Sequence, residues 1–225
     1  YLSQRQELLI IAVNCTHPAE TCFCASTGDG PQVSYGYDMA MTELAEGFVI
    51  EAHSEAGQAM LAKLDLHEAS PQNIEQAKKN LSQAAANQSR TLPQGNLQAA
   101  LFDNLLHVHW DDVAARCLSC GNCTAVCPSC FCHSETDEGD LRLSHSEHIR
   151  QWDSCFTEGH SYIHGITIRS STTQRYRQWL THKLGSWHEQ YGRSGCVGCG
   201  RCITWCPAGI DLTEEVKAIV GGEDE

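Results

Sequence analysis

The chain of 225 residues contains no apolar run long enough to cross a membrane and no segment resembling the core of a secretory signal. A spanning helix needs about 20 mostly apolar residues, and a signal peptide needs an apolar stretch behind a basic start. We therefore expect a soluble, cytoplasmic protein in a reducing environment. The sequence opens at Tyr1 without a methionine and soon enters the apolar run LLIIAV, so we also expect further chain upstream.

A dinucleotide-binding fingerprint is missing too. Such a site needs the pattern G-x-G-x-x-G between a strand and a helix, and the sequence has only the fragment GDG at 28–30. If flavin or nicotinamide is needed, another chain must therefore carry it.

Positive charge is scarce, since 28 acidic residues outnumber 15 basic ones and the formal net charge is -13. This charge argues against nucleic acid as a partner, because phosphate binding needs a positive surface. The longest segment without an acid is residues 159–188, and there Tyr176 and Trp179 follow the spacing of a buried helix face. We expect Arg175 and Arg177 to lie on the opposite, exposed face and to dock a redox partner.

Cysteine, in contrast, is abundant, with 14 residues. A chain of this length can bury a core without disulfide bonds. The cysteines fall into tight groups at 15–24, 117–132 and 196–206, with Cys155 alone. Disulfide frameworks spread their cysteines along the chain, whereas tight groups are typical of metal sites.

Two of these groups share the spacing C-x2-C-x2-C-x3-C-P, which is typical of proteins with two 4Fe-4S clusters. Three thiolates of each motif bind one cluster, and the fourth binds the cluster of the other motif. The spacing predicts a first cluster on Cys117, Cys120, Cys123 and Cys206. It predicts a second cluster on Cys196, Cys199, Cys202 and Cys127.

Zinc is the alternative metal for these motifs, because two C-x-x-C pairs can hold one zinc ion. Zinc has no use for the third and fourth cysteine of each motif, nor for Pro128 and Pro207 behind them. Glycines such as Gly121, Gly198 and Gly200 would let the backbone close around a cluster and direct amides at its sulfurs. Iron and sulfur therefore fit the two motifs better than zinc.

Six cysteines lie outside the two motifs. Cys15, Cys22 and Cys24 follow the first predicted strand and could give three ligands to a third cluster. The fourth ligand would be Cys130, Cys132 or Cys155, or a residue upstream. The alternative is that some of the six are buried structural thiols.

The predicted fold class is α+β, with an α/β domain over residues 1–94 that carries a cysteine-rich loop. The runs at 8–13 and 47–52 are predicted strands, DMAMTELA at 38–45 is a short helical pattern, and Ser70 with Pro71 predicts a helix start. For residues 95–225 we expect an all-helical, ferredoxin-like domain with two 4Fe-4S clusters between its helices. The predicted helices of this half are 97–106, 109–116, 173–188 and one from Asp211, with Glu214 completing a capping box.

Several segments together resemble the iron–sulfur beta subunit of cytoplasmic NiFe sulfhydrogenases, and more distantly the A subunit of anaerobic sulfite reductase. They cover nearly the whole chain: CTHPAETCFCASTGDGP, DMAMTELAEGF, CLSCGNCTAVCPSCFC, WDSC, RYRQWLTHKLGSWHEQYG and GCVGCGRCITWCPAGIDLTEEV. The resemblance implies an α-helical dicluster ferredoxin in the C-terminal half. It also implies electron transfer between a flavin subunit that handles NAD(P)H and a hydrogenase small subunit.

Two functions fit these observations. The first is a non-catalytic electron-transfer subunit of a hydrogenase-type oxidoreductase complex. The second is a catalytic iron–sulfur reductase that acts on a disulfide or another sulfur compound, because a cluster with unusual ligands can be catalytic. Catalytic subunits of the heterodisulfide reductase type use adjacent cysteines, and the sequence has no Cys-Cys pair, which favours the first. A zinc-stapled interaction module is the third alternative.

Overall fold

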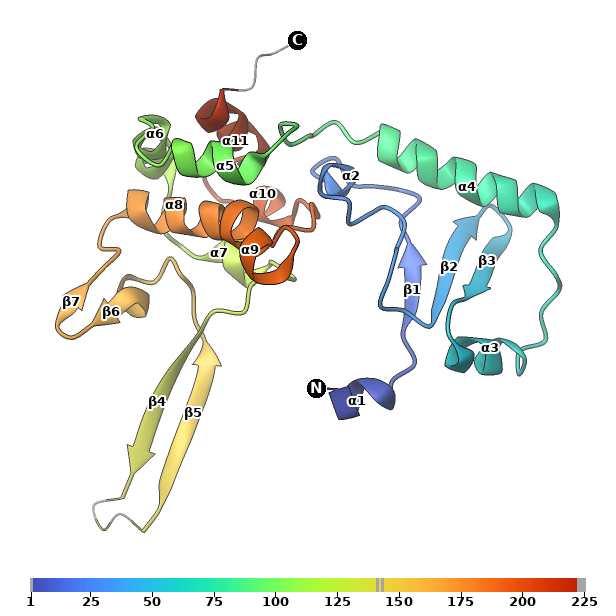
Figure 1. Ribbon diagram of the computed structural model, residues 1–225, viewed down its shortest axis with the longest axis horizontal. Coiled ribbons are helices and arrows are strands. Elements are labelled where there is room, and N and C mark those ends of the chain that lie inside the picture. Colours follow the sequence, from blue (N-terminus) through green and yellow to red (C-terminus); the bar gives the residue numbers. More distant parts are fainter. Residues whose placement is uncertain (1, 141, 143, 222–225) are drawn as a thin grey trace. The chain divides into compact units, whose positions relative to one another are not determined.

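The computed structural model describes residues 2–140, 142 and 144–221, and this part of the chain divides into two compact units (Figure 1). The first unit contains the chain up to Thr91 and also the short segment Val197–Cys199. The second contains Leu92–Cys196 and the chain from Gly200 onward. No helix in the described ranges is both long and apolar enough to span a membrane.

The first unit is built on a three-stranded sheet in the order β1-β2-β3, with β1 parallel to β2 and β2 antiparallel to β3. The side chains that face this sheet from α4 are Ala77, Leu81 and Ala84, and all three are buried. The helix starts as predicted, because the Ser70 hydroxyl accepts a hydrogen bond from the Asn73 amide and Pro71 is the first helical residue. The elements are α1 (Leu2–Gln6), β1 (Ile11–Asn14), α2 (Cys24–Thr27), β2 (Met39–Leu44), β3 (Gly47–Ala52), α3 (Glu55–Leu61) and α4 (Pro71–Ala86).

The helix predicted at 38–45 is wrong, because this segment forms the central strand β2. Met39 and Ala40 are buried, and the strand hydrogen-bonds to both neighbours. Pairing on two sides therefore outweighed the helical propensity of the segment. The strand predicted at 8–13 is confirmed with a shift, as β1 at Ile11–Asn14, and the one at 47–52 is confirmed as β3.

The second unit is mainly helical, but it also contains two antiparallel hairpins, β4–β5 and β6–β7. The prediction of an all-helical second half is wrong on this point. The side chains of β4 and β5 are mostly exposed, so their sequence has no buried face to reveal a strand. The helices are α5 (Leu97–Asp103), α6 (His109–Arg116), α7 (Asn122–Ala125), η1 (Glu158–Ser161), α8 (Thr172–Thr181), the π-helical turn η2 (His182–Ser186), α9 (Trp187–Tyr191), α10 (Arg201–Thr204) and α11 (Leu212–Val220). The strands are β4 (His133–Gly139), β5 (Ser146–Trp152), β6 (Tyr162–Ile163) and β7 (Ile166–Thr167).

The core of the second unit is formed by α5, α6, α8 and α11. Tyr176 and Trp179 of α8 are buried, as their helical spacing predicted. The prediction of an exposed cationic face on this helix is wrong. Arg175 is only 9% exposed and donates to the Ser170 carbonyl, and Arg177 donates to the Leu105 carbonyl at 2.6 Å.

Candidate iron–sulfur sites

The two motifs fold into the same kind of turn. In the first, Ser119 and Gly121 have left-handed φ values of 50° and 74°. In the second, Gly198 and Gly200 occupy the corresponding positions with 62° and 68°. Gly121 and Gly200 each lie at the N-cap of a four-residue helix, α7 or α10. The repeated left-handed residues reverse the chain within each motif.

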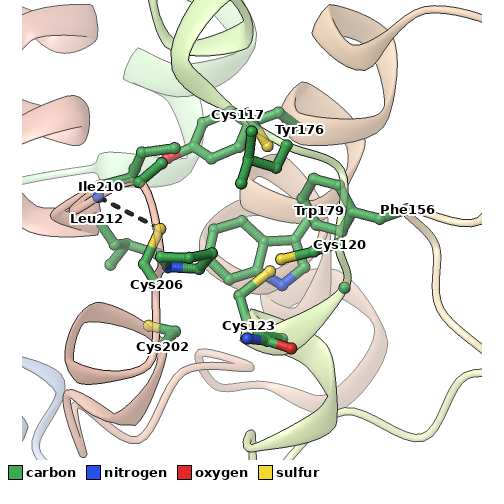
Figure 2. Close-up of a pocket in the computed structure, with 15 residues that line it drawn as sticks. Cys117, Cys120, Cys123, Phe156, Tyr176, Trp179, Cys202, Cys206, Ile210 and Leu212 are labelled. Atoms are coloured by element: carbon green, nitrogen blue, oxygen red, sulfur yellow. Dashed lines mark hydrogen bonds between the residues drawn. The ribbon is translucent and has the colours of Figure 1, made fainter.

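Five thiols line one pocket of the second unit (Figure 2). Four of them are the ligands predicted for the first cluster, and Cys206 reaches this pocket from the second motif although it lies far from the first in sequence. The fifth is Cys202, which the spacing had assigned to the second cluster. The thiols are those of Cys117, Cys120, Cys123, Cys202 and Cys206.

The walls of this pocket are mostly apolar and aromatic, from Phe156, Tyr176, Trp179, Ile210 and Leu212. Burial raises the pKa of the Cys117 thiol and, with the neighbouring Cys202 thiol, that of Cys123. A thiolate in such a pocket needs a compensating positive charge, and a bound metal provides it by replacing the proton.

Backbone amides already point at two of these sulfurs. The Ile210 amide donates to the Cys206 sulfur at 3.3 Å, which is the dashed line in Figure 2. The Ser119 amide lies 3.5 Å from the Cys117 sulfur. Amide hydrogen bonds to cluster sulfurs stabilise the more negative, reduced state.

Two further donors in the pocket lining have no partner among the described residues. They are the Tyr176 hydroxyl and the Trp179 indole NH, which are both buried. A buried donor without an acceptor costs free energy, and the sulfurs of a cluster and its thiolates are acceptors. The donors, the thiols and the apolar walls therefore fit a 4Fe-4S cluster.

Cys127 is the first-motif cysteine that is predicted to bind the second cluster, and it lies beside a buried ammonium group. Lys183 is 5% exposed, and its Nζ donates to the Ser129 hydroxyl at 3.1 Å and to the Gly195 carbonyl at 3.3 Å. Burial opposes its charge, but the nearby sulfurs of Cys127 and Cys130 outweigh this and raise the pKa of Lys183. Cys196 of the second motif is also close enough to contribute to this effect.

Cys199 lies in the first unit with the segment Val197–Cys199. Its carbonyl accepts a long hydrogen bond from the Cys22 thiol at 3.8 Å, and the Gly198 carbonyl accepts one from the Phe23 amide at 2.8 Å. Cys15, Cys22 and Cys24 interact electrostatically within this unit. The Gln88 amide donates to the Cys24 sulfur at 3.0 Å, and burial raises the pKa of that thiol.

The other three cysteines outside the motifs lie in the second unit and make thiol–thiol contacts. A hydrogen bond from Cys130 lowers the pKa of Cys127 to about 4. A hydrogen bond from Cys155 lowers the pKa of Cys132 to about 6. In the described ranges, no three His, Cys, Asp or Glu side chains are placed to hold a single metal ion.

Residues 116–210 match the family model of the 4Fe-4S dicluster domain. This segment contains the whole first motif, the whole second motif and both hairpins.

The matched segment lies within a longer similarity. Over 225 aligned positions the chain is 29% identical to sulfhydrogenase 2 subunit beta of Pyrococcus furiosus, and the alignment covers 97% of the chain. The resemblance to sulfhydrogenase beta subunits is thereby confirmed. The chain spans 64% of the length of that relative. No solved structure matches the chain.

The sequence did not reveal the donors in the pocket lining or the buried Lys183. Tyr176 and Trp179 were predicted as core residues from their spacing, and nothing in that pattern distinguishes a packing aromatic from one that lines a cluster pocket. Lys183 lies within residues 159–188, and no sequence pattern around it indicated that it would be buried on a π-helical turn.

Proposed function

We propose that this chain is an electron-transfer subunit that relays electrons through 4Fe-4S clusters between a flavin subunit that handles NAD(P)H and the small subunit of a NiFe hydrogenase. The observation that supports it best is the pocket in which Cys206 joins the three leading cysteines of the first motif. The similarity to a sulfhydrogenase beta subunit supports the partners.

In the proposed ligand sets, the fourth cysteine of each motif binds the cluster of the other motif. The first cluster is held by Cys117, Cys120, Cys123 and Cys206. The second is held by Cys196, Cys199, Cys202 and Cys127. Cys15, Cys22 and Cys24 would give three ligands to a third.

When bound, the clusters supply one-electron redox chemistry. The protein contributes thiolates that fix each cluster, apolar walls that keep water away from the first one, and hydrogen-bond donors directed at sulfur. Donors and exposure set the reduction potential, so the pocket lining determines how readily the first site accepts an electron.

The assignment of Cys206 to the cluster of the first motif can be tested with Cys206→Ser. We expect this change to damage the first-motif cluster more than the second, because the lost thiol belongs to the pocket of the first motif. EPR spectra of the reduced variant would measure both clusters. The reciprocal control is Cys127→Ser, which should damage the second-motif cluster. Loss of only the second-motif signal in Cys206→Ser would contradict the proposed ligand sets.

The relay function can be tested on the isolated chain with its clusters in place. We expect a strong reductant to reduce the clusters, and we expect the chain alone to show neither NAD(P)H oxidation nor reduction of sulfur compounds. Addition of the flavin subunit should make cluster reduction by NAD(P)H possible. Sulfur reduction by the isolated chain would favour the catalytic reductase instead.

A further inference from the structure

The cysteines outside the two motifs are divided between the two units. Three lie in the first unit around the loop after β1, and three lie in the second unit next to the dicluster motifs. The second-unit cysteines are Cys130, Cys132 and Cys155.

All three second-unit cysteines line one pocket. Its walls include the aromatic side chains of Phe131, Trp179 and Trp187. The pocket is distinct from the one that holds the first-motif thiols, although Trp179 contributes to both. Three thiols thus share a mostly aromatic pocket that neither ferredoxin motif requires.

The β4–β5 hairpin explains how Cys155 reaches this pocket. Cys132 directly precedes β4, and the base of the hairpin pairs His133 with Trp152. The Asp153 amide then donates to the Cys132 carbonyl at 3.1 Å, which holds the two strands together beyond the ladder. As a result, the thiol and the backbone amide of Cys155 both donate to the Cys132 sulfur.

The residues just beyond the hairpin are firmly held. Ser154 is within 2.8 Å of the Thr124 hydroxyl of α7, and Asp153 lies 2.7 Å from His160. The position of Cys155 is therefore fixed by the strand pairing and by these contacts of the two residues that precede it.

Lys183 lines the same pocket and gives it a positive charge. This ammonium group is buried, and it donates hydrogen bonds to the neutral oxygens of Ser129 and Gly195. In the described part of the chain no carboxylate lies within ion-pair distance of it. A buried ammonium without a carboxylate is costly unless another anion lies nearby, and the sulfurs of Cys127 and Cys130 lie close to this one.

We propose that Cys130, Cys132 and Cys155 bind an additional iron–sulfur cluster, separate from the two clusters of the ferredoxin motifs and independent of Cys15, Cys22 and Cys24. Lys183 balances part of its negative charge. The site goes beyond the proposed relay, because it does not depend on which subunits the chain joins. Contact between Cys130 and Cys127 places it next to a proposed ligand of the second cluster.

The first experiment leaves the proposed site intact. In the triple variant Cys15→Ser, Cys22→Ser and Cys24→Ser of the full chain, we expect about twelve iron atoms per chain, which is three cubes of four. Iron and zinc would be measured together by mass spectrometry. About eight iron atoms, or zinc in place of the missing four, would overturn the proposal.

The second experiment removes the site. The triple variant Cys130→Ser, Cys132→Ser and Cys155→Ser should lose about four iron atoms relative to the unsubstituted chain while the EPR signals of both ferredoxin clusters persist. Persistence of those signals would show that the variant is folded. Their loss in an otherwise folded chain would contradict the proposed ligand sets of the two ferredoxin clusters, on which the relay depends. An unchanged iron content would overturn the additional site, as would a Cys132–Cys155 disulfide found by mass spectrometry in anaerobically prepared, unsubstituted protein.

Discussion

Tyr176 lines the pocket of the first-motif thiols, and its buried hydroxyl has no partner in the described part of the chain. Burial raises the pKa of this hydroxyl well above its ordinary value, so it remains a proton donor at any physiological pH. A neutral donor next to a cluster stabilises the reduced state without adding charge. We therefore expect this single atom to influence the reduction potential of a cluster bound in this pocket.

Tyr176→Phe removes the donor and keeps the ring that packs against Trp110, Phe156 and Trp179. We expect the reduction potential of the first-motif cluster to fall, because the reduced state loses a hydrogen bond. An EPR-monitored redox titration would measure the change. Tyr191→Phe is the control, since Tyr191 is exposed and should leave both potentials unchanged. A potential that rises or stays constant in Tyr176→Phe would show that the hydroxyl does not act on the cluster.

Gly198 is constrained both by its backbone and by its neighbours. Its φ is +62°, and a Cβ atom there would lie 2.5 Å from the Cα and backbone nitrogen of Cys24. Neither backbone atom can move away without disturbing the cysteine loop. A side chain at this position is therefore excluded by packing as well as by conformation.

Gly198→Ala should destabilise the first unit by more than about 2 kcal/mol, because conformational strain and a steric clash add together. Gly28→Ala is the matched control in the same unit, since Gly28 has a φ of +72° and nothing within 4 Å of the added Cβ. The control should cost only the conformational part, about 1 to 2 kcal/mol. Denaturant unfolding monitored by circular dichroism would compare the two variants. Equal losses would mean that the cysteine loop can yield to the added methyl group.

Helices α6 and α11 are tied together at one buried carboxylate. Glu215 of α11 lies 2.6 Å from Nε2 of His109 and 2.7 Å from Nη2 of Arg116, both on α6. Arg116 directly precedes Cys117, so this contact also fixes the helix that leads into the first motif. The last helix thus supports the start of the first cluster site.

Glu215→Gln should lower the free energy of unfolding of the second unit by about 1 to 2 kcal/mol, because Arg116 loses its charged partner but remains half exposed to solvent. Glu214→Gln is the control on the same helix, and its exposed side chain should make the change nearly neutral. Denaturant titration of both variants with the clusters in place would measure the difference. Similar stabilities for the two variants would show that the contact contributes nothing.

The elements differ in how well the sequence predicts them. Helix α4 has a serine cap and a proline at its first position, and these two residues predicted where it starts. Strand β2 was not predicted, because its burial depends on β1 and β3, which flank it in space on either side. The β4–β5 hairpin has no buried face, so hydrophobic alternation could not reveal it.

The cysteine sites also differ in how well the sequence predicts them. Spacing predicted four of the five thiols that line the first pocket, because the repeated motif carries the ligand pattern of a dicluster protein. The meeting of Cys132 with Cys155 could not be predicted, because a hairpin of mostly exposed residues joins them.

At the scale of the whole molecule, the formal net charge is -13, and the arginines of α8 do not form an exposed positive surface. Arg175 and Arg177 donate to backbone carbonyls within the second unit. Small anions should therefore be repelled as they approach the chain.

We expect the rate at which an anionic reductant reduces the clusters to rise a few-fold between about 0.01 M and 0.15 M salt, as the Debye length falls from about 30 Å to about 8 Å. Stopped-flow absorbance would measure the rate, and a neutral reductant is the control that should show no salt dependence. A rate that falls with salt would indicate a local positive surface near the clusters.

The segment Val197–Cys199 belongs to the first unit although about a hundred residues separate it from Thr91. A ribosome adds roughly 5 to 20 residues per second, so the first unit waits on the order of 5 to 20 s for its last three residues. Cys206, which completes the first pocket, emerges later still. During synthesis, the nascent chain therefore exposes the loop of Cys15, Cys22 and Cys24 and the first motif before the residues that pack against them have been made.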